Sequence, residues 1–322
     1  MRPSPRQVPD VFRAAAIRSR PPRPRLFPPR ALSTSTSSSS NPAPPSAASS
    51  PSVNETEISH FSALAASWWD PHGPSRPLHL MNPLRHEFIR ACLASSSSAA
   101  SPSPSSPSSP SSQTPPPGGG GGLRYLDVGC GGGIFAESAA RLADTASVTG
   151  VDPSAAVVAV ARAHARRDPA LALASGAGKL RYVHATIEAL ALPADARARF
   201  DVVSVFEVVE HVERPGAFLD RAGDFVRPGG WLVLSTIART WTSWLTTKVV
   251  AEDVLRLVPR GTHDWRKYVN EHELRAYFAA GARGRWGPPR VMGVVYVPGL
   301  GWKAVRGSEK LGNYFFGVQK IG

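Results

Sequence analysis

Two carboxylates and one imidazole stand close together in the segment Phe206–Val212, which reads FEVVEHV. If this segment were helical, Glu207 would share a face with Glu210 and His211, which follow it at i+3 and i+4. Such a set could ligate a divalent cation, Mg²⁺ or another, and leave open positions for the oxygens of a catechol-type substrate. The same residues also allow a metal-free site, in which His211 is a general base oriented by a glutamate such as Glu210, or a purely structural role. At this point all three interpretations stay open.

A glycine-rich loop lies earlier in the chain, in Leu126–Gly133 (LDVGCGGG), where a strand candidate turns into a helix candidate. Glycine lets a backbone approach a ligand closely, and the N-terminus of a helix offers free N–H groups. The dinucleotide spacing G-x-G-x-x-G fails here, because position 134 is Ile134. The loop therefore predicts a ligand site of a different type.

Two acids accompany Gly129 and Gly131 of this loop. Asp127 stands two residues before Gly129, where it could accept a hydrogen bond from a ligand ammonium group. Asp152 ends the second strand candidate, 23 residues after Gly129, where a carboxylate can bind both hydroxyls of a ribose. This arrangement resembles the class I S-adenosylmethionine-dependent methyltransferases and predicts S-adenosyl-L-methionine as the cofactor and methyl donor.

Short apolar strands alternate with helical stretches after Gly122. Near-continuous apolar runs such as Asp201–Phe206 are typical of parallel strands that are buried on both faces. The alternation predicts a doubly wound α/β domain over 123–322, with a mostly parallel, seven-stranded, Rossmann-like sheet. No helix separates the last two strands, so we expect them to form an antiparallel pair at one edge. Strands are expected at 123–128, 147–152, 180–184, 201–206, 231–236, 291–297 and 313–320, and helices at 133–143, 154–167, 215–226 and 270–280.

Two segments of biased composition flank a predicted N-terminal helical cap over 51–94, whose helices are expected from residue 57 and from about Pro83. Residues 1–30 hold eight Arg against one acid, Asp10, and supply +7 of the formal net charge of +13. This Arg-rich, acid-poor start predicts a mitochondrial transit peptide over 1–50; a basic tail that binds nucleic acid is the alternative. Residues 95–117 hold 12 Ser and 7 Pro and are followed by five Gly, which predicts a disordered insert over 95–122.

The composition also excludes several classes of protein. Cys92 and Cys130 are the only cysteines, so a disulfide framework and a Cys-rich zinc site are excluded. No apolar run approaches the ~20 residues that a membrane-spanning helix needs. The charge outside 1–50 is only +6, and the Asn/Asp-Pro-Pro-aromatic motif typical of base methylation is absent after the fourth strand. We therefore expect no nucleic-acid partner.

The chain resembles one family over roughly 55–322, apart from the insert. The GCGGG and EHV elements occur in many methyltransferases, whereas WWD, NPLR and GTHDW-K together are specific. On these motifs the chain is similar to the ubiquinone-biosynthesis O-methyltransferases, the mitochondrial enzymes of coenzyme Q synthesis. The matching stretches are Phe61–Asp70, Leu78–Ile89, Leu126–Ser138, Val148–Pro153, Glu207–Val212, Arg227–Ser235, Gly261–Asp264 and Asn313–Gln319.

The resemblance implies an activity and a set of site residues. The activity is transfer of the sulfonium methyl group to a ring hydroxyl of a polyprenylated catechol or hydroquinol, namely polyprenyl-dihydroxybenzoate and demethylubiquinol. Arg85 would bind the methionyl carboxylate of the cofactor, and Phe206 would pack on the adenine side. The other implied contacts are Gly129 and Asp152 for the cofactor, and Glu207, Glu210 and His211 for the metal ion.

The resemblance also implies a peripheral location on the matrix side of the mitochondrial inner membrane, within a multi-subunit biosynthetic complex. The segment 238–268 interleaves Trp241 and Trp244 with Lys and Arg, which predicts a lid that also contacts the lipid surface. Two alternatives compete with this function. One is a methyltransferase of another small phenol, a nucleic acid or a protein, and the other is a catalytically idle subunit of the complex.

Overall fold

The computed structural model describes residues 55–98, 121–171, 179–240, 267–281 and 285–321. The transit peptide over 1–50, most of the insert over 95–122 and most of the segment 238–268 lie outside these residues, so what the sequence indicates for them stays a prediction. Within the described part, no helix is both long enough and apolar enough to cross a bilayer.

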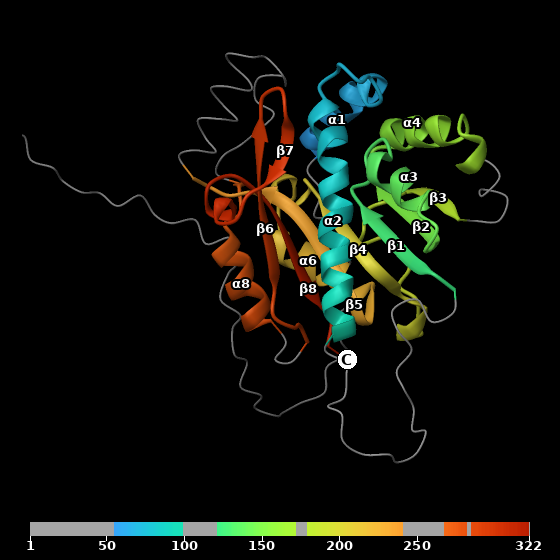
Figure 1. Cartoon of the computed structure of the whole chain (residues 1–322). Coiled ribbons are helices and arrows are strands. Elements are labelled where there is room, and N and C mark those ends of the chain that lie inside the picture. The colour runs from blue at the N-terminus through green and yellow to red at the C-terminus, as the bar shows by residue number, and fades with distance from the viewer. Residues whose placement is uncertain (1–54, 99–120, 172–178, 241–266, 282–284, 322) are drawn as a thin grey trace, which may run out of the picture.

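A mixed β-sheet forms the centre of the fold (Figure 1). Five strands run parallel in the order β3-β2-β1-β4-β5, and the antiparallel strands β8, β6 and β7 continue the sheet beyond β5. This order confirms the predicted doubly wound, mostly parallel sheet and the antiparallel pair near its edge. The strands are β1 (Leu123–Val128), β2 (Thr145–Asp152), β3 (Leu180–His184), β4 (Phe200–Phe206), β5 (Val226–Ile237), β6 (Arg290–Val297), β7 (Gly301–Ala304) and β8 (Asn313–Gln319).

Among the described residues the sheet has eight strands, so the prediction of seven was wrong by one. After β6 the chain turns at 298–300 and returns as the short strand β7, which pairs antiparallel with the end of β6. Leu300 N–H donates to the carbonyl of Val297 across this turn at 3.0 Å. The four residues of β7 include only one large apolar side chain, Trp302, so their pattern was too weak to indicate a strand.

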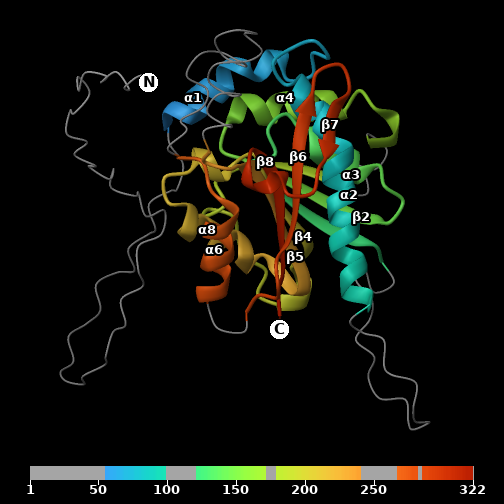
Figure 2. The same ribbon diagram turned by 60° about the vertical axis from the view of Figure 1, so that its left-hand side comes forward.

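Helices cover both faces of the sheet, as Figures 1 and 2 show from two directions. Helices α2, α3 and α4 pack on one face, and α6 and α8 on the other, each over its own buried cluster. Phe315 and Phe316 are neighbours on β8 and belong to different clusters, because successive residues of a strand point to opposite faces. The helices are α1 (Glu55–Leu64), α2 (Arg76–Ser98), α3 (Ile134–Ala140), α4 (Ala155–Ala165), α6 (Pro215–Asp224) and α8 (Glu271–Ala280).

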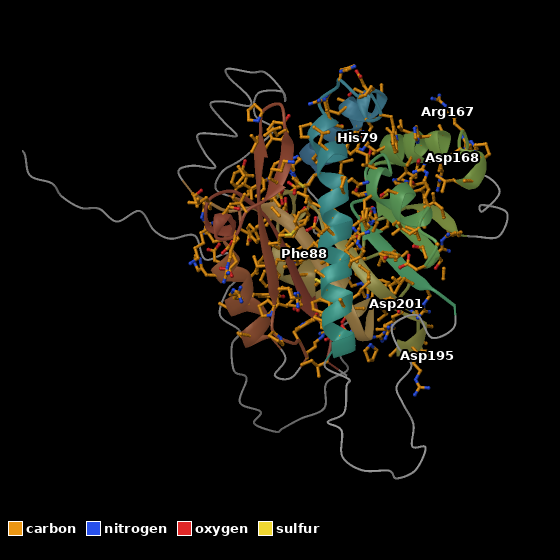
Figure 3. All side chains as sticks on the ribbon, viewed as in Figure 1. His79, Phe88, Arg167, Asp168, Asp195 and Asp201 are labelled. Carbon is orange, nitrogen blue, oxygen red and sulfur yellow. The ribbon has the colours of Figure 1, made fainter. Side chains whose placement is uncertain are left out.

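Helix α2 begins at Arg76, seven residues before the predicted start at Pro83. Pro77 lies in its first turn, where a missing N–H group is tolerated, whereas Pro83 lies inside the helix. The sequence prediction took the wrong proline as the start signal. The ring of Phe88, labelled in Figure 3, stacks on Phe315 of β8 with 5.5 Å between the ring centroids. This second helix of the predicted cap is therefore part of the main core.

The last turn of α2, Ser95–Ser98, reaches into the predicted insert and is fixed to the sheet through Ser96. Ser96 Oγ accepts hydrogen bonds from Trp231 Nε1 and from Gln319 Nε2, both at 2.9 Å. Ser96→Ala leaves the N–H group of the buried Trp231 without its partner, so we expect the free energy of unfolding to fall by about 1–3 kcal/mol in urea denaturation.

Deletion of 103–114 serves as the contrast, and it should leave the free energy of unfolding nearly unchanged. Loop length enters the entropy of loop closure only logarithmically. A large loss of stability in the deletion variant would show that the insert contains an element that the fold needs.

Candidate active site

The glycine loop 129–133 connects β1 to α3 at the carboxyl edge of the parallel strands. Gly129 and Gly131 have left-handed backbone conformations, with φ of 70° and 53°. A Cβ atom at Gly129 would collide with Val208, and one at Gly131 would collide with the ring of Trp68. Both positions therefore require glycine, on account of the backbone conformation and of the close approach of other groups.

Asp152 lies at the end of β2, directly beside this loop. Its Oδ2 accepts a hydrogen bond from the N–H group of Gly131 at 3.0 Å, and its Oδ1 accepts one from Ser154 N–H at 2.9 Å. Burial raises the pKa of this carboxyl, and the two N–H groups counteract that effect. Each oxygen keeps a further lone pair, so the carboxylate is fixed in place and can still accept from two ribose hydroxyls.

Asp127 is buried on β1, with 3% of the residue exposed. Its Oδ1 accepts a hydrogen bond from Ser204 Oγ at 2.7 Å. Burial raises the pKa of Asp127 to about 7, although the bond from Ser204 and the charge of Arg85 both act to lower it. The carboxyl therefore changes its charge near neutral pH, and a ligand ammonium group beside it would keep it ionised.

Arg85 on α2 carries a buried positive charge next to these groups. The residue is 4% exposed, and its Nε has no hydrogen-bond partner. Burial lowers the pKa of Arg85, while the charges of Glu207 and Asp127 raise it. No carboxylate in the described part of the chain forms an ion pair with it. An unpaired guanidinium is costly to bury, so this position is suited to an anion such as the methionyl carboxylate.

Phe206 ends β4 and supports Arg85, whose guanidinium carbon lies 4.9 Å from the centroid of its ring. The ring also packs edge to face on Phe135 and Phe315, with centroids 4.9 and 6.1 Å away. These contacts place Phe206 at the Arg85 end of the site, whereas Asp152 lies on β2. They support a role in holding Arg85, and the packing on the adenine side stays a prediction.

Asn82, which belongs to the NPLR sequence together with Arg85, ties α2 to α3. Its Nδ2 donates to the carbonyl of Ile134 at 3.2 Å and to Ser138 Oγ at 2.8 Å. Arg85 follows Asn82 by three residues and therefore lies on the same side of α2. The bonds of Asn82 thus fix Arg85 relative to the glycine loop, which leads directly into α3.

Glu207 and Glu210 follow β4, and hydroxyl groups on β5 hold both carboxylates. Ser235 Oγ donates to Glu207 Oε1 at 2.6 Å, and Thr236 Oγ1 donates to Glu210 Oε2 at 2.9 Å. Glu207 has a left-handed backbone φ of 56°, a strained conformation for a residue with a Cβ atom that surrounding contacts must maintain. Burial, and after it the charge of Glu207, raises the pKa of Glu210 to about 7.

The predicted helical face of Glu207, Glu210 and His211 is not formed. A 3-10 helix covers only Val209–His211, and Glu207 precedes it, so the i+3 and i+4 alignment is lost. The ring of His211 packs edge to face on Phe61 of α1, with 5.0 Å between the centroids. In the part of the chain that the structure describes, no group of three His, Cys, Asp or Glu is arranged to hold a metal ion. The predicted three-ligand arrangement is therefore not present among the described residues, and the metal ion stays a prediction.

Two tryptophans after α1, to which the sequence prediction gave no role, cover the glycine loop. Trp68 is buried with its ring against Gly131 and Gly132, and its Nε1 has no hydrogen-bond partner. Trp69 Nε1 donates to the carbonyl of Gly132 at 2.8 Å. The ring of Trp69 stacks on that of His164, with 3.5 Å between the ring centroids. The signal for them was the WWD motif, which belongs to the specific part of the resemblance.

Comparisons with known proteins match the chain to one family over most of its length. The family described as "Methyltransferase domain" matches residues 85–282, a range that contains every predicted site residue. The mitochondrial ubiquinone biosynthesis O-methyltransferase of Candida albicans is 38% identical, over 84% of this chain and 86% of its own. The protein of the same name from Schizosaccharomyces pombe is 40% identical, over 84% and 87%. A ubiquinone biosynthesis O-methyltransferase of Rhodopseudomonas palustris (strain BisB18) is 42% identical, over 70% and 79%.

The raised pKa of Asp127 makes the stability of the fold depend on pH. The carboxyl has a pKa of about 7 in the folded state and 3.8 in the unfolded chain. Between these pH values the folded state therefore binds more protons. The contribution of Asp127 to stability therefore falls as the pH rises through this window. We expect Asp127→Asn to make the fall in stability smaller, with Glu210 and Asp152 accounting for the rest, as measured by urea denaturation at a series of pH values.

Ser204→Ala is the matched variant, because it removes the hydrogen bond that lowers the pKa of Asp127. It should move the window to higher pH without abolishing it. If the wild type and both variants showed the same dependence of the free energy of unfolding on pH, the contribution assigned to Asp127 would be contradicted.

Proposed function

Because the chain belongs to the family of the ubiquinone biosynthesis O-methyltransferases, we propose that its acceptor is a ring hydroxyl of a polyprenylated catechol or hydroquinol. The chain is an S-adenosylmethionine-dependent O-methyltransferase. In the reaction the bond from the sulfonium sulfur to the methyl carbon breaks and a bond from the phenolate oxygen forms, so S-adenosylhomocysteine leaves and the phenol proton passes to a base. The observation that carries the proposal is 40% identity to such an enzyme over 84% of the chain.

The proposed position of the cofactor follows from three charged residues. Arg85 would pair with the methionyl carboxylate, Asp127 with the ammonium group and Asp152 with the ribose hydroxyls. The support is charge complementarity: a buried cation without an ion pair and a buried acid with a pKa of about 7 match the two charges of an amino acid. Gly129 and Gly131 would allow the ligand to approach the backbone.

The acceptor hydroxyl must lose its proton before or during the transfer, and two routes are proposed for this step. A divalent cation, Mg²⁺ or another, would have Glu207 and Glu210 as its candidate ligands, and when bound it would stabilise the phenolate. Without a cation, His211 would accept the proton directly. Because the described residues do not bring His211 into a three-ligand group, no step is assigned to the metal.

The proposed location is the matrix side of the mitochondrial inner membrane, in peripheral association and within a multi-subunit complex. Its support is the mitochondrial relatives and the Arg-rich start of the chain. The membrane contact proposed for the segment 238–268 rests on its sequence, in which Trp241, Trp244 and Leu245 lie between the basic residues Arg239 and Lys248. Flotation with cardiolipin-containing vesicles tests it, with the triple serine variant of these residues as the comparison.

The binding of the cofactor tests the role of Arg85. Arg85→Met removes charge-assisted hydrogen bonds, so we expect the Kd for S-adenosylmethionine to rise roughly tenfold or more in calorimetry, with methyl transfer to a short-chain demethylubiquinol reduced in parallel. Arg90→Met, an exposed position on the same helix, is the control and should bind as the wild type does. A wild-type chain that binds no S-adenosylmethionine would favour the catalytically idle subunit.

Chelation distinguishes the two routes of deprotonation. We expect EDTA to abolish methyl transfer, added Mg²⁺ to restore it, and Glu210→Gln to lower the rate, whereas Glu213→Gln, at an exposed position nearby, should not. Activity that survives EDTA and is lost in His211→Ala would instead support the metal-free base.

A further inference from the structure

The β6–β7 hairpin stands at the same edge of the sheet as the candidate active site. Strand β8 runs antiparallel to β5, and β6 runs antiparallel to β8, so β6 points in the direction of the parallel strands. The turn 298–300 at its carboxyl end therefore lies at the edge where the glycine loop lies. Figure 1 shows the red hairpin at the same end of the molecule as α1.

One face of the hairpin is packed and fixes its position. Tyr296 pairs with Trp302 across the two strands, and their rings meet edge to face with 5.3 Å between the centroids. Trp302 Nε1 donates to the carbonyl of Pro77 in the first turn of α2 at 2.9 Å. Alternate residues of a strand point to opposite faces, so the neighbours of Tyr296 and Trp302 are turned away from α2.

The other face is exposed and contains large apolar side chains. Val295 is 39% exposed and pairs directly with Lys303, which is exposed as well. Val305, which directly follows β7, is 44% exposed. Leu300 at the turn is 68% exposed. The hairpin thus presents apolar groups from its turn to the end of its second strand.

The charge of this surface is mainly positive. Lys303, Arg306 and Lys310 are exposed, and none of them takes part in an ion pair among the described residues. Between 290 and 312 the chain has one acid, Glu309, against four basic residues. Exposed apolar side chains among unpaired cations suit the headgroup region of an anionic bilayer, where the apolar groups reach the acyl boundary and the cations meet lipid phosphates.

We propose that the β6–β7 hairpin contacts the surface of an anionic lipid bilayer through Val295, Leu300, Lys303, Val305 and Arg306. This contact holds the carboxyl edge of the sheet against the lipid. The proposal rests on the proposed function, because a substrate with a polyprenyl tail resides in the bilayer and its ring must reach the site while the tail stays in lipid. It assigns a membrane contact to the hairpin itself, separately from the segment 238–268.

A fluorophore at the turn tests the contact directly. Leu300→Cys in the full chain can be labelled selectively with an environment-sensitive dye, because Cys92 and Cys130 are buried and burial raises the pKa of the Cys92 thiol to about 12. We expect vesicles of phosphatidylcholine and phosphatidylglycerol to shift its emission to shorter wavelength. The same dye on Ala198→Cys, which precedes β4 at the opposite edge, should not respond.

Two double variants test the chemistry of the contact by cosedimentation with the same vesicles. We expect Lys303→Glu/Arg306→Glu to lower the partition coefficient roughly thirtyfold or more, and Leu300→Ser/Val305→Ser to lower it as well. The matched control is Arg181→Glu/Arg197→Glu, which changes the charge equally, with Arg181 on the far edge strand β3 and Arg197 near the start of β4. It should bind as the wild type does.

Activity on a short-chain, water-soluble demethylubiquinol separates this proposal from the function on which it rests. Hairpin variants that lose vesicle binding but keep this activity support the contact. Partition coefficients equal to that of the wild type, together with unchanged emission at position 300, would overturn the contact and leave the function standing. Failure of the wild type itself to methylate the soluble substrate would refute the function instead, and the emission and partition data would still decide whether the hairpin binds lipid.

Discussion

A positive charge buried without an ion-pair partner is the constraint on which the rest of the site depends. Arg85 stays inside the fold because Phe206 offers the face of its ring, and because Asp127 and Glu207 lie near enough to favour the charged form. The charge of Arg85 in turn favours an ionised Asp127, which burial opposes. Cation and acid thus favour each other's charged form without forming an ion pair. A zwitterionic ligand would pair its carboxylate with Arg85 and its ammonium group with Asp127.

Two adjacent hydroxyls of β5 hold the glutamates that follow β4. Ser235 and Thr236 are neighbours on the strand, and each donates a hydrogen bond to one glutamate. The carboxylates of Glu207 and Glu210 are therefore both anchored near the end of β5. The left-handed backbone of Glu207 makes this possible, and the same conformation prevents the helical alignment with His211.

Local patterns were enough to predict the sheet, the glycine loop and the position of Asp152, because strand, loop and helix follow one another directly in the chain. Four features could not be predicted for lack of a local signal. The early start of α2 and the strand β7 depend on packing against distant parts of the chain. The orientation of His211 depends on Phe61, 150 residues earlier, and the cover over the loop depends on Trp68 and Trp69. Such contacts follow from tertiary packing, which periodicity does not report.

The stretch from α1 to Trp69 contacts both the glycine loop and the segment that follows β4. Phe61 meets His211, the hydroxyl of Ser62 is 2.8 Å from that of Ser154 beyond β2, and Trp68 lies on the glycine loop. With cofactor and acceptor bound as proposed, this one stretch would cover both the spent cofactor and the methylated product. Both would then leave only when the stretch opens, so the two departures would be kinetically linked. The rate of that opening would set an upper limit on turnover, however fast the methyl group itself is transferred.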